Sequence, residues 1–185
     1  MTARISLDPP RTLVYRLAEW YSRRSYGVVA DPLAAMGHNP RVLLTDARFE
    51  TSLARWKRLD PTLKALAVMA AAVSIGCSWC VDFGYWISSQ EGVDPAKLRA
   101  VPRWRDSDVF TDLERRVMAY AEAMTTTPLT VTDEMVAGLR RELDDAALVE
   151  LTMMVAVENQ RSRFNSALGL ASQGFKDRCE IPAAR

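Results

Sequence analysis

The stretch DPTLKALAVMAAAVSIGCSWCVDFGYW, residues 60–86, decides the fold and carries the most reactive side chains of the chain. An Asp-Pro pair at its start is typical of a helix N-terminus, and apolar residues then recur at three- and four-residue spacing as far as Gly76. Gly76 suits the left-handed residue that ends a helix, and residues 78–89, which contain no proline, can begin the next helix. The sequence therefore predicts two consecutive helices, with Cys77 and Cys80 at the N-terminus of the second.

Helix signals recur along the rest of the chain, whereas strand signals do not. Thr111 and Glu114 have capping-box spacing, and a second Asp-Pro pair precedes Lys97. We find no repeat and no linker rich in glycine and serine, so the predicted fold class is all-α, a single-domain helical bundle. The expected helices run from about Leu13 to before Gly27, from Pro40 toward Trp56, over 61–75 and 78–89, from Pro95 to before Pro102, from Thr111 to Thr125, from Thr132 to Leu143 and from Ala146 toward Ser172.

Composition and charge narrow the function classes. The chain has 185 residues, of which 49% are hydrophobic, and its formal net charge of +1 provides no field that would attract nucleic acid or an acidic membrane. The first ten residues lack the apolar core of a signal peptide, and the longest apolar stretch, residues 65–77, is too short to span a bilayer. We therefore expect a cytoplasmic protein with no nucleic-acid or membrane partner.

The spacing of Cys77 and Cys80 indicates thiol chemistry of one of two kinds. Two thiols separated by two residues can close a small disulfide ring or share a metal ion. Three cysteines are too few for a disulfide scaffold, and in a reducing compartment such a pair is more often catalytic or metal-binding. The unpaired amides and the dipole at a helix N-terminus favour a thiolate there by roughly 0.3–1 kcal/mol.

The segment IGCSWCVDFG, residues 75–84, resembles the cysteine-motif region of the carboxymuconolactone decarboxylase-like, alkylhydroperoxidase D-like superfamily. YAEAM at 120–124, and VELT at 149–152 followed by Asn159, are similar to its downstream helices. The resemblance covers roughly residues 60–170 and implies an all-helical domain of the alkylhydroperoxidase D-like type that assembles into homo-oligomers. It also divides the chain into an N-terminal helical extension (1–59), a helical core (60–172) and a C-terminal tail (173–185).

In members with this motif, the resemblance implies a peroxidase that cycles through a disulfide. By position, Cys80 would attack the peroxide and Cys77 would resolve the sulfenic acid. The substrate would be a peroxide or a disulfide, and a reducing protein or a dithiol would donate electrons. No cofactor and no metal ion are expected.

This sequence departs from the family pattern at two positions that relay protons. A glutamate twelve residues before the first cysteine is replaced by Ala65, and a histidine four residues after the second is replaced by Gly84. A glycine inside a helix indicates a close approach by a packed backbone, a side chain or a ligand, so Gly84 is a candidate for lining a pocket. Trp79, the aromatic residue between the two cysteines, is a second candidate. His38, the single histidine, is expected in a solvent-facing turn.

Other polar and acidic residues are candidates to replace the missing proton relay. Glu150 lies in a segment that is apolar almost all round, so it is either a proton carrier of raised pKa near the thiols or half of a buried ion pair with an arginine. The polar segment 158–165 either lines a pocket or anchors helix packing or a contact between subunits. Asp82 is expected to be a surface or ion-pair residue.

The sequence leaves several functions open. The first is a thiol-disulfide oxidoreductase that reduces peroxides or exchanges disulfides through Cys77 and Cys80. The alternative is a non-catalytic helical oligomer or a redox-sensing module that has lost the Glu/His relay. A metal site would need both cysteines together with Cys179 and His38, and no second closely spaced pair supports it. For decarboxylation of a lactone acid, no residue supplies the general acid.

Overall fold

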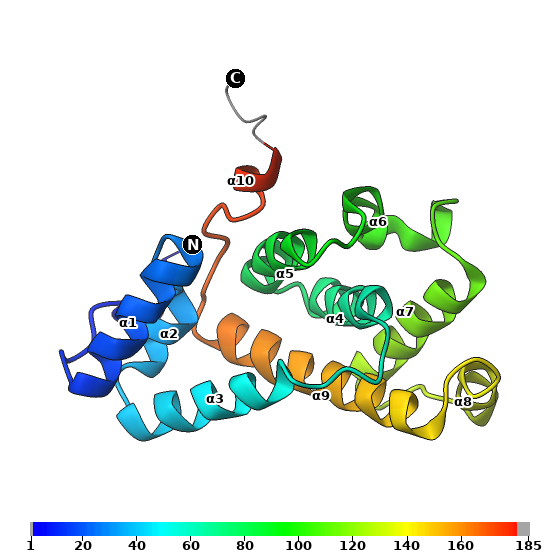
Figure 1. The fold of residues 1–185 in the computed structure, drawn as a ribbon, viewed down its shortest axis with the longest axis horizontal. Coiled ribbons are helices and arrows are strands. Elements are labelled where there is room, and N and C mark those ends of the chain that lie inside the picture. The colour runs from blue at the N-terminus through cyan, green and yellow to red at the C-terminus, as the bar shows by residue number, and fades with distance from the viewer. Residues whose placement is uncertain (1, 181–185) are drawn as a thin grey trace.

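The computed structural model describes residues 2–180, and the regular structure within that range is entirely helical, as predicted (Figure 1). The helices are α1 (Leu13–Tyr26), α2 (Asp31–Met36), α3 (Pro40–Leu53), α4 (Pro61–Ile75), α5 (Ser78–Gln90), α6 (Pro95–Ala100), the 3₁₀ helix η1 (Val101–Asp106), α7 (Asp112–Thr125), α8 (Asp133–Leu139), α9 (Asp145–Ala167) and α10 (Asp177–Glu180).

Local capping explains where the central helices begin and end. The Asp60 carboxylate accepts hydrogen bonds from the amides of the first turn of α4, and Gly76 ends that helix in the left-handed conformation, with φ 79°. Cys77 follows at once as the N-cap of α5. Thr111 and Glu114 form the predicted capping box at the start of α7.

One helix was not predicted, and two helices end earlier than predicted. The helix α2, which begins at an Asp-Pro pair, was not predicted, and α8 ends at Leu139 instead of Leu143. The helix α9 ends at Ala167, well before Ser172. Its last carbonyls accept hydrogen bonds from the guanidinium of Arg4, a residue far away in sequence, and Gly169 then turns the chain with φ 68°.

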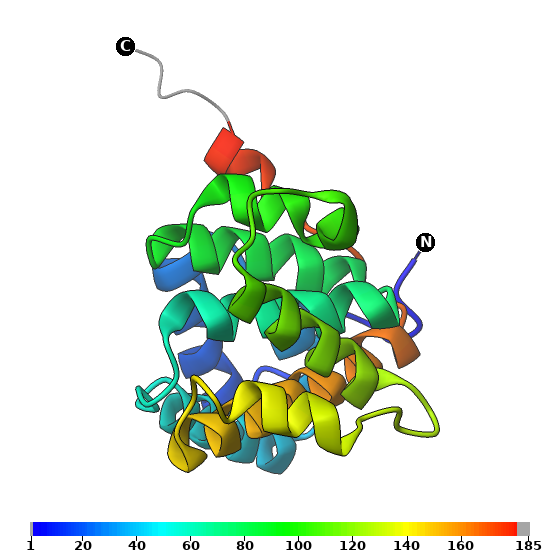
Figure 2. The same ribbon diagram turned by 90° about the vertical axis from the view of Figure 1, so that its right-hand side faces the viewer.

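Helix α4 is the centre of the core. It lies between α5 and α9 in both views and also contacts α7 (Figures 1 and 2). Its many alanines let neighbouring helices approach closely, which explains why the helix is buried on nearly every side. The buried residues of α4 are Leu63, Ala65, Leu66, Ala67, Met69, Ala70, Ala71 and Ala72.

The N-terminal helices α1, α2 and α3 pack against one another at one end of the molecule (Figure 1). After α9 the chain runs past α5 to α10; we call residues 172–176 the C-terminal strap. The division into an extension, a core and a tail stays a prediction, and positions 181–185 of the proposed tail lie outside the described residues. Within residues 2–180, no helix is both long enough and apolar enough to cross a membrane.

Candidate functional site

Cys77 and Cys80 are joined by a disulfide at the N-terminus of α5, and their Cα atoms are 5.3 Å apart. That Cα separation lies within the usual range for disulfides. Because Gly76 ends α4 and Cys77 caps α5, the turn between the two helices sets the pair in the helix geometry that the sequence predicted. The two-residue spacing has therefore closed a disulfide ring.

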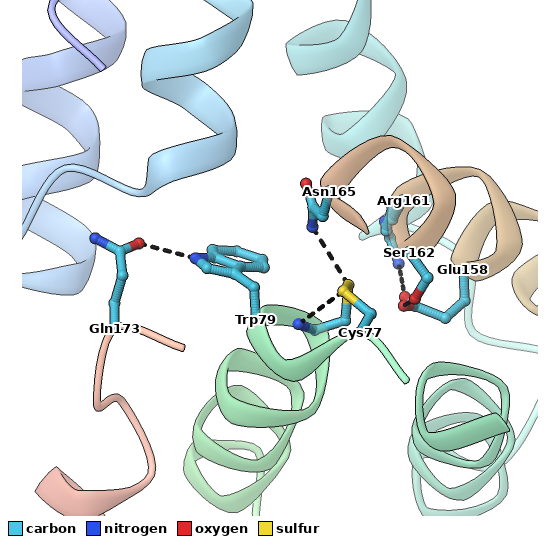
Figure 3. The surroundings of a disulfide bond; sticks show 8 residues. Cys77, Trp79, Glu158, Arg161, Ser162, Asn165 and Gln173 are labelled. Atoms are coloured by element: carbon cyan, nitrogen blue, oxygen red, sulfur yellow. Dashed lines mark hydrogen bonds and ion pairs between the residues drawn. A yellow bond between two sulfur atoms is a disulfide. The ribbon is translucent and has the colours of Figure 1, made fainter. Parts of the chain in front are cut away.

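Each sulfur has a hydrogen-bond donor, but the donors differ. The backbone N–H of Cys80 donates to Cys77 Sγ at 3.2 Å, so the helix amide supports Cys77. Cys80 Sγ accepts from Asn165 Nδ2 at 3.3 Å, across from α9 (Figure 3). The helix amide therefore acts on Cys77, whereas the donor to Cys80 is a side chain of another helix.

The disulfide is nearly sealed from solvent. Cys77 is 1% exposed and Cys80 is 7% exposed, so Cys80 is the more accessible residue of the pair. Trp79 stacks on Phe83 with ring centroids 4.9 Å apart, and Phe175 of the C-terminal strap packs edge-on against both rings. An aromatic cluster thus packs against the pair.

The strap is held by Asp82, which was predicted to be a surface or ion-pair residue and is instead buried and bound by neutral donors. Asp82 is only 6% exposed. Its carboxylate accepts hydrogen bonds from the Ser172 hydroxyl and from the amides of Gln173, Phe175 and Lys176, at 2.7–3.0 Å. Burial alone would raise the pKa of Asp82, but these hydrogen bonds to the ionised form hold it below its usual value. Asp82 is therefore a structural anchor that closes the strap over α5.

The two residues predicted to line a pocket lie in packed surroundings. The indole N–H of Trp79 donates to Gln173 Oε1 at 2.8 Å, so the ring is fixed beneath the strap. A Cβ on Gly84 would lie 2.7 Å from Met69 Sδ, so a side chain of α4, not a ligand, makes the close approach. A cavity of about 410 Å³ opens on another side of α5, and neither residue borders it: its lining is Val73, Gly76, Ser78, Val81, Asp82, Pro102, Ser172, Lys176 and Asp177.

Glu150 forms an ion pair away from the disulfide. Its carboxylate lies 2.5 Å from Lys64 Nζ and accepts from the amide of Arg58 at 2.8 Å. Burial opposes ionisation, yet these partners lower the pKa of Glu150, so the carboxylate stays charged at neutral pH. The structure favours the ion-pair interpretation over the proton carrier, with a lysine in place of the expected arginine.

The polar segment of α9 supplies the groups that face the disulfide. Glu158, Ser162 and Asn165 follow one another at helical spacing on one face, and they are 3%, 0% and 2% exposed. Figure 3 shows all three beside the disulfide, with the carboxylate of Glu158 directed toward the sulfur atoms. The sequence indicates the segment but not this face, whose signal is three polar residues at i, i+4 and i+7.

Glu158 differs from Glu150 in the weakness of its partners. Ser162 Oγ donates to Glu158 Oε1 at 2.6 Å, but Arg161 Nη1 is 3.5 Å away. Burial raises the pKa of Glu158 from its ordinary value of 4.5 to about 7, against the opposing charge of Arg161. A carboxyl group that changes protonation near neutral pH therefore lies beside the thiol pair.

The remaining candidates lie apart from this site. His38 is exposed between α2 and α3, and its Nε2 atom lies 2.8 Å from the carbonyl oxygen of Ser6. Cys179 is a free thiol on α10, with Gln90 Nε2 at 3.9 Å from its sulfur. Cys77 and Cys80 are bonded to each other, and within residues 2–180 no cluster of His, Cys, Asp and Glu is placed to hold a metal ion.

The fold and the cysteine pair define a class, the all-helical proteins with a CxxC disulfide at a helix N-terminus. The chain belongs to the carboxymuconolactone decarboxylase family, whose model matches residues 40–123. That match begins earlier than the resemblance at residue 60 and includes α3 and α4. It also contains both cysteines of the disulfide.

Similar proteins extend the likeness to nearly the whole chain. The uncharacterized protein YnjA of Escherichia coli (strain K12) is 36% identical over 174 residues, which is 94% of each chain. A structure of the debrominase Bmp8 in complex with 2,3,4-tribromopyrrole has a TM-score of 0.81 at 20% identity, covering 98% of this chain and 100% of that one. An alkylhydroperoxidase AhpD core, an uncharacterized peroxidase-related protein from Ralstonia eutropha JMP134, has a TM-score of 0.78 at 15% identity, covering 91% and 94%. These structures confirm the predicted fold type.

Proposed function

We propose that this protein is a thiol-disulfide oxidoreductase that reduces a peroxide through Cys80 and Cys77. The observation that carries the proposal is the Cys77–Cys80 disulfide, in which each sulfur has its own hydrogen-bond donor. Cys80 is the nucleophile, because it is the more exposed of the two residues and because Asn165 donates to its sulfur. Cys77 then resolves the oxidised intermediate.

Each step of the proposed cycle conserves atoms, protons and electrons. The Cys80 thiolate attacks one peroxide oxygen, the O–O bond breaks, and the other oxygen leaves as an alcohol after it takes up one proton. Cys77 attacks the resulting sulfenic acid, water leaves, and the disulfide forms. A dithiol or a reducing protein supplies two electrons and two protons to restore both thiols. We propose that this cycle operates in a homo-oligomer in the reducing cytoplasm.

The test measures consumption of tert-butyl hydroperoxide with dithiothreitol as the electron donor. We expect Cys80→Ser to abolish consumption. In a separate sample treated with peroxide after dithiothreitol is removed, we expect Cys77→Ser to accumulate a sulfenic acid on Cys80 that dimedone labels. Cys179→Ser is the matched control, because that thiol is free and lies on α10, and it should leave the rate unchanged. Full consumption by the Cys80→Ser protein would overturn the proposal.

The alternative is a redox sensor or a scaffold without turnover, and the burial of both sulfurs supports it. A sensor would form the disulfide once with a stoichiometric amount of peroxide and would not consume an excess in the presence of dithiothreitol. A scaffold would resist both peroxide and alkylation in the folded state.

A further inference from the structure

The proposed cycle needs a group that takes up and returns a proton, and the family's two relay positions provide none. Ala65 is an apolar residue buried in α4, and Met69 fills the space beside Gly84. Asp82 is occupied by the C-terminal strap, and Glu150 by its ion pair with Lys64. The proton must therefore come from elsewhere in the fold.

The face of α9 that contacts the disulfide carries a carboxyl group. Asn165 fixes the orientation of this face because its side chain donates to Cys80 Sγ. Ser162 lies one turn before Asn165, and Glu158 one turn before Ser162, so all three point in the same direction. Figure 3 shows the Glu158 carboxylate directed toward the sulfurs, with the Ser162 hydroxyl holding one of its oxygens.

The charges around Glu158 leave it poorly compensated. Arg161 is its nearest cation, but the guanidinium of Arg161 donates to both carboxylate oxygens of Glu50 on α3, at 2.7 and 2.5 Å. Asp46, one turn earlier on α3, also acts on Arg161. Arg161 is thus the shared counter-ion of three carboxyl groups. Its contact with Glu158, at 3.5 Å, is longer than either contact with Glu50.

The charged groups that act on Glu158 are Arg161, of opposite sign, and Glu50, of like sign. Helix α7 contributes Tyr120 and Thr125, which bond to Thr152 and Asn159 of α9. Helix α4 contributes Lys64, which pairs with Glu150 two turns earlier on α9, and otherwise small apolar side chains such as Ala72. Cys77, the N-cap of α5, and Cys80, in its first turn, contribute the two sulfurs of the disulfide. A buried carboxyl group in such surroundings can be neutral or ionised near neutral pH, and a proton carrier needs both states.

We infer that Glu158 is the proton carrier of the Cys77–Cys80 pair. As a carboxylate it takes up the proton that leaves the Cys80 thiol, and as a carboxylic acid it returns that proton to the oxygen released when the O–O bond breaks. No net proton is consumed in this step. Ser162 acts as a positioning residue that holds the carboxyl group toward the sulfurs. The inference rests on the proposed function for its chemistry.

The first test uses no peroxide, so it is independent of turnover. The reduced full chain carrying Cys179→Ser is alkylated with iodoacetamide over a pH range that brackets 7, and the Cys80 peptide is quantified by mass spectrometry. We expect the alkylation rate to show a step near pH 7, the pKa of Glu158, and we expect Glu158→Gln to remove it, because a charge that appears beside a thiol changes how readily that thiol ionises. Glu150→Gln, a buried glutamate of the same helix, is the matched control and should keep the step.

The second test measures peroxide consumption. We expect Glu158→Gln to lower the rate about 10²-fold, and Glu158→Asp to restore part of it, because general acid-base catalysis contributes that much. If the parent protein consumes peroxide and the pH-rate profiles of parent and Glu158→Gln superimpose, the inference is overturned while the proposed function stands. If no variant turns over but the alkylation step vanishes with Glu158→Gln, the proposed function fails and the proton coupling stands.

Discussion

Glu158→Gln should stabilise the protein at neutral and higher pH, although it removes a group that we place at the centre of the chemistry. The carboxyl group is 3% exposed, and burial raises its pKa from 4.5 to about 7. In the unfolded chain the same group has its ordinary pKa of 4.5. Between pH 4.5 and about pH 7 the folded state therefore binds more protons than the unfolded state. Stability therefore falls as the pH rises through this window.

The magnitude follows from the difference between the two pKa values. Each unit of pKa corresponds to about 1.4 kcal/mol, so the ionised Glu158 costs up to about 3 kcal/mol above pH 7. Glutamine has nearly the shape of the protonated acid and carries no charge. Arg161 is not left alone in the variant, because Glu50 still binds its guanidinium.

The assay is reversible unfolding of the oxidised protein and of Glu158→Gln, at about pH 4 and about pH 8. At the lower pH the two proteins should be equally stable. At the higher pH the variant should gain up to about 3 kcal/mol, or roughly 6–12 °C in Tm for a chain of this size. A variant that is less stable at the higher pH, or an equal difference at both, would refute the view of Glu158 as a poorly compensated buried acid.

Three further changes test the structural parts of the site. Asp82→Asn should lower the free energy of unfolding by about 2 kcal/mol or more, because four hydrogen bonds to the Asp82 carboxylate hold the C-terminal strap. The amides of the strap should exchange faster with deuterium in the variant. The difference in stability from wild type should shrink below pH 3.8, because the stabilisation by a carboxyl of lowered pKa is lost as that carboxyl is protonated. Gly84→Ala should lower stability by about 1 kcal/mol, because the added methyl group crowds Met69. In a Met69→Ala background the same change should raise stability by about 1 kcal/mol, because alanine has the higher helix propensity. Equal effects in both backgrounds would exclude the contact. Lys64→Ala should lower the free energy of unfolding by about 3 kcal/mol in chemical denaturation, because it leaves the buried carboxylate of Glu150 without its cation. Unchanged alkylation kinetics of the thiol pair in this variant would show that the ion pair takes no part in the chemistry.

The fold was predicted from the sequence largely because helix boundaries are set by local contacts. Asp60 binds amides two and three residues away, and the capping box at Thr111 spans three residues, so both signals can be read directly from the printed chain. The end of α9 was wrong because its carbonyls are capped by Arg4, from the other end of the chain. No pattern of neighbouring residues indicates such a partner.

The candidate site was predicted only in part. The spacing of the cysteines and the helix start at Ser78 placed the pair correctly. The role of Asp82 was misjudged because its partners lie about ninety residues later, in a segment that has no periodic pattern. Glu150 and Glu158 look alike in sequence, and they differ only in which cation the neighbouring helices bring to each.

The sequence by itself determined that the chain is helical, where most helices begin, and that two thiols share the first turn of one of them. These features depend on contacts within a few residues, and their rules are the same in every protein. Only the tertiary structure decided what surrounds the sulfurs: Asn165 reaches Cys80 across 85 residues of sequence, and Glu158 arrives on the same helix face. The acidity of a buried group depends on burial and on nearby charges, and both are set by how the helices pack.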